Sequence, residues 1–210
     1  MRIEDGVRVP DETERIAIER VRPDVDCGRF ASKRVLGDIV DVEADIFTHG
    51  HDEIAANVEF RQAGSHSWRS VAMEPLGNDR WRGCFPVDRI GEYRFRVVAW
   101  VDEFASWRRD LLAKIGAAQD VSLDREVGAR LAEEAAKRAG ARDQDALVKW
   151  AARLRGGLDP KTIGALIQLV ALGRRTADRS RAAVATTTSP VWVDRPLAGC
   201  SAWYELFPRS

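Results

Sequence analysis

The sequence is poor in the features that mark secreted and metal-stapled proteins. Its 210 residues include only three cysteines, Cys27, Cys84 and Cys200, which lie far apart and form no CxxC pair. An odd and scattered set of this kind argues against a disulfide framework and against a structural zinc site. We therefore interpret the three cysteines as reduced thiols and expect a cytoplasmic protein.

Long apolar runs and an excess of charge of one sign are also lacking. No run approaches the ~18 residues that a membrane helix needs, and the N-terminal sequence MRIEDGVRVPDETERI is too charged for a signal peptide. The 33 basic and 33 acidic residues give a formal net charge of +0. No field of the whole molecule would attract nucleic acid or an anionic membrane, so we expect neither as a partner.

Motifs of nucleotide-binding and hydrolytic sites are missing as well, since there is no GxGxxG, P-loop or GxSxG. The segment Thr48–Asp52 (THGHD) resembles the opening of a metallo-hydrolase loop, in which HxH supplies two zinc ligands. The only other histidine is His66, and the second Asp-His pair of that motif is absent. A polar turn is the preferred interpretation, and we expect no catalytic residue, no cofactor and no metal in this chain.

A basic run extends from Arg174 to Arg181 and offers a possible phosphate-binding patch. It contains one acid, Asp178, and no aromatic residue. Because single-stranded nucleic-acid sites usually combine basic residues with aromatics, and charge runs are usually solvated, a solvated loop is the preferred interpretation.

Residues 15–102 alternate apolar and polar side chains with a period of two, most clearly in VDVEADI at 40–46. Turn sequences such as Gly77-Asn78-Asp79 separate the alternating segments. This period indicates half-buried antiparallel strands. Successive strands with no helix between them favour an immunoglobulin-like β-sandwich.

Beyond Asp102 the apolar period changes to about 3.6 residues, which predicts amphipathic helices. Four of them with short connections predict a bundle. The N-caps expected for the second, third and fourth helices are Ser122, Asp143 and Asp159. The glycines expected to end them are Gly140 for the second, Gly156 and Gly157 for the third, and Gly173 for the fourth.

The strand pattern returns at 191–193 after a polar linker at 176–188. The predicted fold class is therefore α+β: an immunoglobulin-like antiparallel β-sandwich with a helical subdomain of about four helices inserted before its last strand. The expected organisation is a flexible tail at 1–14, the sandwich at 15–102 plus 183–202, the helical insertion at 103–182, and the truncated start of a catalytic barrel at 203–210.

Three tryptophans in the strand region are the candidate ligand contacts. Trp68, Trp81 and Trp100 could form a sugar-stacking platform, since aromatic faces bind pyranose rings through apolar contact. Packing in the core or between domains is the preferred interpretation.

Several stretches carry a family resemblance: PDVDCGRF at 23–30, NDRW at 78–81, AWVD at 99–102 and VDRPLAGCSAWYELFPRS at 193–210. They resemble the α-1,4-glucan:maltose-1-phosphate maltosyltransferases (the GlgE family) of the α-amylase superfamily. In that family V-D-R-P-x-A-x-x-x-A-W-Y-E-x-F-P-R-S joins an N-terminal domain to the catalytic barrel. Specific matches cover 15–122 and 189–210, whereas 140–188 match only in helical character.

The resemblance implies a parent enzyme of glycogen and α-glucan biosynthesis. It would transfer maltosyl units from α-maltose 1-phosphate to α-1,4-glucans by double displacement, with an Asp nucleophile and a Glu acid/base at the ends of barrel strands. A barrel needs ~250 residues. The resemblance therefore implies that this chain is a non-catalytic N-terminal region, inactive alone, whose parent adds the barrel, the glucan and maltose 1-phosphate as partners.

The resemblance also implies a homodimer through the helical insertion. Wide apolar stripes on the first and last predicted helices support this, because so thin a layer is expected to leave part of them uncovered. The stripes consist of Leu111, Leu112, Ile115, Ile163, Leu166, Ile167 and Val170.

Two alternatives to the scaffolding function remain open. One is a carbohydrate-binding module that holds α-glucan on exposed tryptophans. The other is an unrelated immunoglobulin-like interaction protein, which the C-terminal match disfavours.

Overall fold

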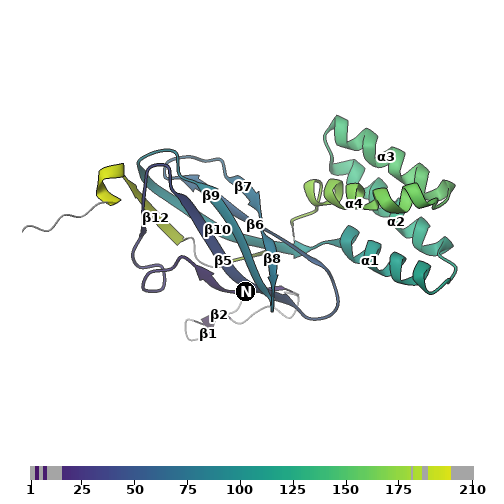
Figure 1. Cartoon of the computed structure of the whole chain (residues 1–210), viewed down its shortest axis with the longest axis horizontal. Helices are drawn as coiled ribbons and strands as arrows, with labels where there is room; N and C mark the ends of the chain where they lie inside the picture. The colour runs from purple at the N-terminus through teal and green to yellow at the C-terminus, as the bar shows by residue number, and fades with distance from the viewer. Residues whose placement is uncertain (1–2, 5–6, 9–15, 181, 186–188, 200–210) are drawn as a thin grey trace, which may run out of the picture. The chain divides into compact units, whose positions relative to one another are not determined.

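A computed structural model describes residues 3–4, 7–8, 16–180, 182–185 and 189–199 (Figure 1). Contacts divide the chain into two compact units. The first unit comprises 1–17, 47–55 and 99–183, and the second comprises 18–46, 56–98 and 184–210. The four helices all belong to the first unit, and most of the β-structure belongs to the second.

The fold is α+β, with two mostly antiparallel sheets. The four-stranded sheet has the order β3 (Ile16–Arg22), β5 (Ile39–Thr48), β9 (Arg80–Pro86), β8 (Glu74–Gly77). The six-stranded sheet has the order β4 (Ser32–Val35), β12 (Ser189–Asp194), β10 (Gly91–Val101), β6 (Ile54–Gln62), β7 (Arg69–Ala72), with β11 (Ala183–Val184) paired to β10. β12 runs parallel to β4 and antiparallel to β10.

The predicted alternation is clear in β5, where Val40, Val42 and Ala44 are fully buried and the residues between them are partly exposed. Side chains from the two sheets meet in one apolar core. Phe60 on β6 stacks on Phe85 on β9 with 4.3 Å between the ring centroids. Aromatic contacts of this kind stabilise the core beyond the burial of their area.

The strand predicted near residues 190–194 pairs with the earlier sheet, as expected. Val191 lies opposite Tyr93, and Val193 lies opposite Gly91. The predicted linker at 176–188 is too long, because residues 183–184 form β11, which pairs with β10.

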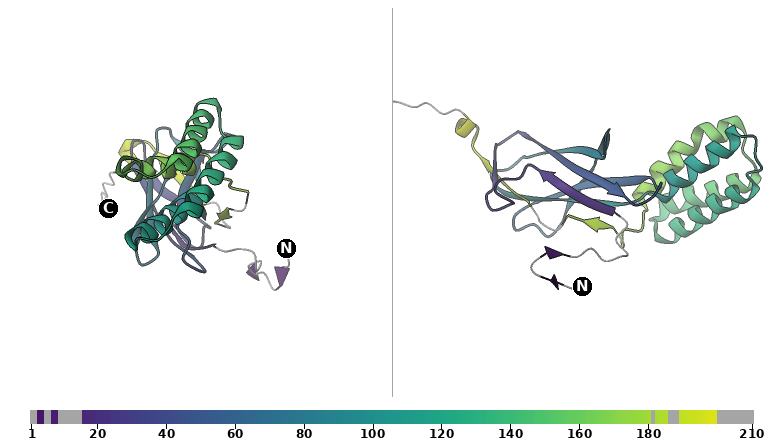
Figure 2. Two further views of the ribbon diagram at one scale, coloured as in Figure 1. Left: turned by 90° about the vertical axis from the view of Figure 1, so that its right-hand side faces the viewer. Right: turned by 90° about the horizontal axis from the view of Figure 1, so that it is seen from below.

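The four predicted helices are present and pack side by side (Figure 2). They are α1 (Glu103–Gly116), α2 (Ser122–Arg138), α3 (Ala141–Gly156) and α4 (Pro160–Arg175). Leucines from α1, α3 and α4 and alanines from α2 form their shared core. The fully buried leucines are Leu111, Leu147, Leu154, Leu166 and Leu169.

Two predicted N-caps are wrong. α2 starts with Ser122 itself, after Val121, and α3 starts two residues before Asp143, after Gly140. Neither cap position makes a side-chain hydrogen bond. The backbone N–H and hydroxyl of Ser122 instead donate to Asp120. Asp143 lies in the first turn, where a carboxylate interacts favourably with the helix dipole.

The other predicted helix boundaries have mixed outcomes. Asp159 caps α4 by accepting a hydrogen bond in its first turn, and α3 ends at Gly156, both as predicted. α2 ends before Gly140, however, and α4 continues for two residues past Gly173. Gly173 is not a stop signal. It is buried within α4, where the ring of Phe104 occupies the space that a side chain would need.

Parts of the predicted terminal segments lie outside the described residues. This applies to the barrel start at 203–210 and to most of the tail at 1–14. Within the tail, β1 (Ile3–Glu4) and β2 (Val7–Arg8) form an antiparallel pair.

Candidate functional site

Trp68, the first candidate ligand contact, lies just before β7 and is half-buried. Its ring centre is 4.5 Å from the guanidinium of Arg61 on β6 and 4.4 Å from that of Arg96 on β10. Arg96 also donates a hydrogen bond of 2.8 Å to Glu59 on β6. The indole ring therefore makes cation–π contacts with two guanidinium groups. Each such contact contributes roughly 0.5–1 kcal/mol.

Trp81 and Trp100 have other surroundings. Trp81 on β9 is half-buried and donates its indole N–H to the carbonyl of Ile46 at 3.2 Å. Trp100 near the end of β10 is only 4% exposed, and Arg179 lies 4.2 Å over its ring. Trp100 is therefore not an exposed sugar contact.

The three predicted tryptophans do not form one platform. Trp81 belongs to the four-stranded sheet, whereas Trp68 contacts two strands of the six-stranded sheet. The more exposed indole is one that the sequence reading missed, Trp192 on β12, at 46% exposure. The signal was present, because Trp192 alternates with the buried Val191 and Val193 and must point outward.

The THGHD segment forms the connection between β5 and β6, as the turn interpretation predicted. Gly50 has a φ of 118°, which an L side chain rarely adopts. Arg109 on α1 donates hydrogen bonds to the carbonyl of His51 and to Glu53. Among the described residues no cluster of three or more His, Cys, Asp or Glu side chains could hold a metal ion.

The basic run after residue 173 makes contacts within the first unit. Its first two arginines lie in α4 and not in a loop, although their side chains are solvated, at 52% and 59% exposure. Arg174 donates a 2.5 Å hydrogen bond to Asp102. Arg175 pairs with Asp143, and Arg179 covers Trp100. Asp102 is itself 3% exposed. Arg181, the last residue of the run, lies outside the described residues.

Asp102 is a buried polar group of the first unit with several hydrogen bonds. One carboxylate oxygen accepts the backbone N–H of Ala105 at 2.9 Å, which caps α1, and the other accepts from Arg174. The backbone N–H of Asp102 donates to the carbonyl of Glu53 at 2.7 Å. Ser106 in turn accepts the backbone N–H of Glu53. These bonds fix the start of α1.

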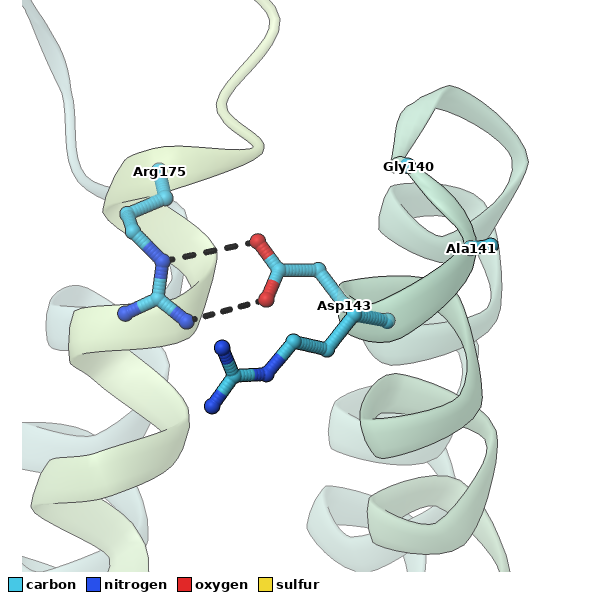
Figure 3. A pocket seen from close by; sticks show the side chains of 5 residues that line it. Gly140, Ala141, Asp143 and Arg175 are labelled. Atoms are coloured by element: carbon cyan, nitrogen blue, oxygen red, sulfur yellow. Dashed lines mark hydrogen bonds and ion pairs between the residues drawn. The ribbon is translucent and has the colours of Figure 1, made fainter.

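A shallow pocket lies where the start of α3 meets the end of α4 (Figure 3). Its lining residues are Gly140, Ala141, Arg142, Asp143 and Arg175. The carboxylate of Asp143 accepts hydrogen bonds of 3.1 and 3.4 Å from the guanidinium of Arg175. This internal anion occupies the place at the helix N-terminus that a bound anion would take.

The apolar stripes invoked for a dimer are mostly internal. Leu111, Leu166 and Val170 are buried, and Leu112 and Ile115 pack against the same core. The expectation that a thin layer leaves part of these stripes uncovered therefore holds only at Ile167. Of the stripe residues, Ile167 alone is exposed, at 55%, and the other exposed large apolar side chains of the helices are Leu123, Val127 and Val148.

In the described part of the chain, none of the helices combines the length and the apolar character that crossing a bilayer requires.

Comparison with known proteins finds one matching family, described as alpha-1,4-glucan:maltose-1-phosphate maltosyltransferase, domain N/S, over residues 14–195. The chain is similar to maltosyltransferases of that name from Chlorobaculum tepidum (42% identity over 202 residues), Myxococcus xanthus (40% over 211) and Mycobacterium tuberculosis (35% over 239). These alignments cover 95%, 94% and 98% of this chain but 30%, 32% and 34% of the relatives. The chain thus spans about a third of the length of these relatives.

Proposed function

Because the chain belongs to the N/S-domain family of the α-1,4-glucan:maltose-1-phosphate maltosyltransferases, we propose that it is the non-catalytic scaffolding region of such an enzyme. The observation that carries the proposal is the match over residues 14–195 to a domain that makes up about a third of the relatives. The enzyme that contains it moves maltosyl units from maltose 1-phosphate to α-1,4-glucan. The chemistry belongs to a catalytic barrel elsewhere in the longer protein.

The test is an assay of phosphate release from maltose 1-phosphate in the presence of an α-1,4-glucan acceptor. The 210-residue chain and a longer protein that contains it are compared at equal concentration. We expect the longer protein to release phosphate and the 210-residue chain to release none. Turnover by the pure 210-residue chain contradicts the non-catalytic role, and a longer protein without turnover contradicts the maltosyltransferase assignment.

We further propose that the β-structure is an immunoglobulin-like sandwich with the helices inserted before its last strand. The order β3-β5-β9-β8 corresponds to A-B-E-D, and β12-β10-β6 corresponds to G-F-C. Near the start of β10, the hydroxyl of Tyr93 donates a hydrogen bond of 2.7 Å to the carboxylate of Asp88, five residues upstream. This bond resembles the tyrosine corner of immunoglobulin-like domains, in which the hydroxyl bonds to the backbone a few residues upstream. The domain limits 15–102 plus 183–202 and 103–182 are part of this proposal. An experimental structure of the chain, superposed on immunoglobulin domains, tests it.

The second candidate function, glucan binding by the sandwich, rests on Trp68 and now on the exposed Trp192. Isothermal titration of the 210-residue chain with maltoheptaose separates it from scaffolding. Scaffolding predicts no binding heat. Saturable heat that is lost in Trp68→Ala or Trp192→Ala would favour the binding module instead. A cytoplasmic location remains a prediction from the cysteine pattern.

A further inference from the structure

Three connections meet at one end of the strands of the second unit. The turn after β4 donates the N–H of Leu36 to the carbonyl of Asp194, the last residue of β12, at 2.9 Å. The same turn exchanges two hydrogen bonds of 3.0 Å with the connection after β9: Gly37 donates to Val87, and Val87 donates to Asp38. Backbone bonds thus hold the ends of β4, β9 and β12 as one ordered surface.

Exposed apolar side chains gather on this surface, which we call the apolar end: Leu36, Ile39, Ile90, Trp192 and Leu197. Ile39 starts β5 and lies opposite Pro86, the last residue of β9. Ile39 and Leu197 are 64% and 77% exposed. Side chains this open contribute little to the stability of the unit itself, so their burial needs another partner.

Exposed charged residues lie close in the sequence to these apolar side chains. Asp88 and Arg89 precede Ile90, and Asp194 and Arg195 follow Trp192 and Val193. Apolar groups within a polar rim are the usual anatomy of a surface that docks another domain.

The last described residues lie at the apolar end. β12 leads into a short 3₁₀ helix, η1 (Pro196–Gly199), the last described element, which is drawn in yellow in Figure 1. η1 packs against the end of β4, where a Cβ added to Gly199 would lie 3.3 Å from Val35. The relatives continue well beyond the length of this chain, since the alignments cover 30% and 32% of them.

We propose that the apolar end is the docking surface for the part of the same maltosyltransferase chain that follows residue 210. This inference rests on the proposed function, because it assumes that the catalytic domain follows. A domain that follows η1 closely in the sequence is tethered to this surface and can cover Leu36 and Leu197 without a long linker. Interfaces between domains of one chain bury roughly 600–1,500 Å².

Hydrogen–deuterium exchange tests the docking without any substitution. Exchange is measured by mass spectrometry in the 210-residue chain and in the longer enzyme. Peptides that contain residues 36–39 and 87–91 should exchange roughly tenfold or more slowly in the longer enzyme, because docking suppresses local opening. The internal control is the β8–β9 turn at 77–79, at the opposite end of β9, which should exchange equally in both. Equal exchange at the apolar end overturns the proposal.

Paired substitutions provide a second test. Ile39→Asp places a charge on the apolar end, and Leu76→Asp places one on a residue 56% exposed beside the β8–β9 turn. Both should leave the urea midpoint of the 210-residue chain nearly unchanged, because substitutions of exposed residues usually have little effect on stability. In the longer enzyme only Ile39→Asp should restore fast exchange at 87–91. Equal effects of the two substitutions contradict docking.

Phosphate release by the same longer enzyme separates the two proposals. An active enzyme whose apolar end is not protected from exchange contradicts the docking inference alone. An inactive enzyme whose apolar end is protected from exchange contradicts the proposed function and still supports the docking surface.

Discussion

The indole ring of Trp107 on α1 fills the space beside Gly128 on α2 where any other residue would place its Cβ. A Cβ built at Gly128 would lie closer to three ring atoms of Trp107 than real Cβ contacts allow. The indole N–H of Trp107 donates to the carbonyl of Asp124, one turn earlier on α2, at 2.7 Å. The ring is therefore fixed both by a hydrogen bond and by the absence of a side chain at Gly128.

The first prediction is that Gly128→Ala destabilises the chain. Alanine has the better helix propensity by about 1 kcal/mol, but overpacking of a fixed ring costs typically 1–3 kcal/mol. The net change in the free energy of unfolding, measured by urea titration with far-UV circular dichroism, should be a loss. Gly164→Ala is the matched control, because no neighbouring atom lies within 4 Å of its Cβ position on α4. It should stabilise the protein by roughly 0.5–1 kcal/mol, and equal effects would contradict the packing argument.

The second prediction compares two adjacent arginines. Arg174→Met leaves the buried carboxylate of Asp102 without its charged partner, which should cost about 2–4 kcal/mol in the free energy of unfolding. Arg175→Met breaks the more exposed pair with Asp143, whose side chains are 59% and 31% exposed, and should cost less than about 1 kcal/mol. Urea unfolding of both variants measures the difference. A loss of the same size in both variants would show that the burial of Asp102 does not increase the contribution of its ion pair to the free energy of unfolding.

The third prediction concerns acid stability. Hydrogen bonds from Arg155 on α3, and then from Arg130, lower the pKa of Glu126 on α2 from 4.5 to about 2. Arg155 also lowers the pKa of Glu133. Because the folded pKa lies below the unfolded one, the contribution to stability is complete above pH 4.5 and is lost as the pH falls towards 2.

Urea unfolding at pH 6, 4 and 3 measures this loss, and Arg155→Gln provides the comparison. The variant lacks the main partner that lowers both pKa values, so its stability should fall less between pH 6 and 3 than that of the parent chain. Other acidic residues with lowered pKa values contribute equally to both proteins and cancel in the difference. Parallel pH profiles would contradict the role of Arg155.

Local sequence patterns predicted those elements that depend on residues close together in the sequence. Alternation located β5, and the Asp159-Pro160 pair located the start of α4. The starts of α2 and α3 were missed because their cap positions, Val121 and Gly140, make no side-chain hydrogen bond.

Contacts between distant residues could not be predicted in this way. Gly173 looked like a helix stop because its actual partner, the ring of Phe104, is far away in the sequence. The pair formed by Asp102 and Arg174 spans 72 residues and leaves no local signal. For the candidate site, the sequence pointed to Trp68, Trp81 and Trp100, but burial depends on packing, and the exposed indole among the described residues proved to be that of Trp192.

The last prediction concerns the expected homodimer through the helices. Because most of the apolar stripe residues are buried, another apolar surface of the helices must form the contact. The exposed apolar pair on α2 consists of Leu123 and Val127, one turn apart and 74% and 44% exposed. A two-fold contact that includes this pair must bury at least ~1,000 Å² in total to be stable. Sedimentation velocity at micromolar concentration should give twice the chain mass of 23.4 kDa. The double variant Leu123→Asp with Val127→Asp should sediment as a monomer, whereas Leu76→Asp should not. A parent chain that stays at 23.4 kDa over the micromolar range contradicts the dimer, and a dimer that survives the double substitution excludes this face of α2.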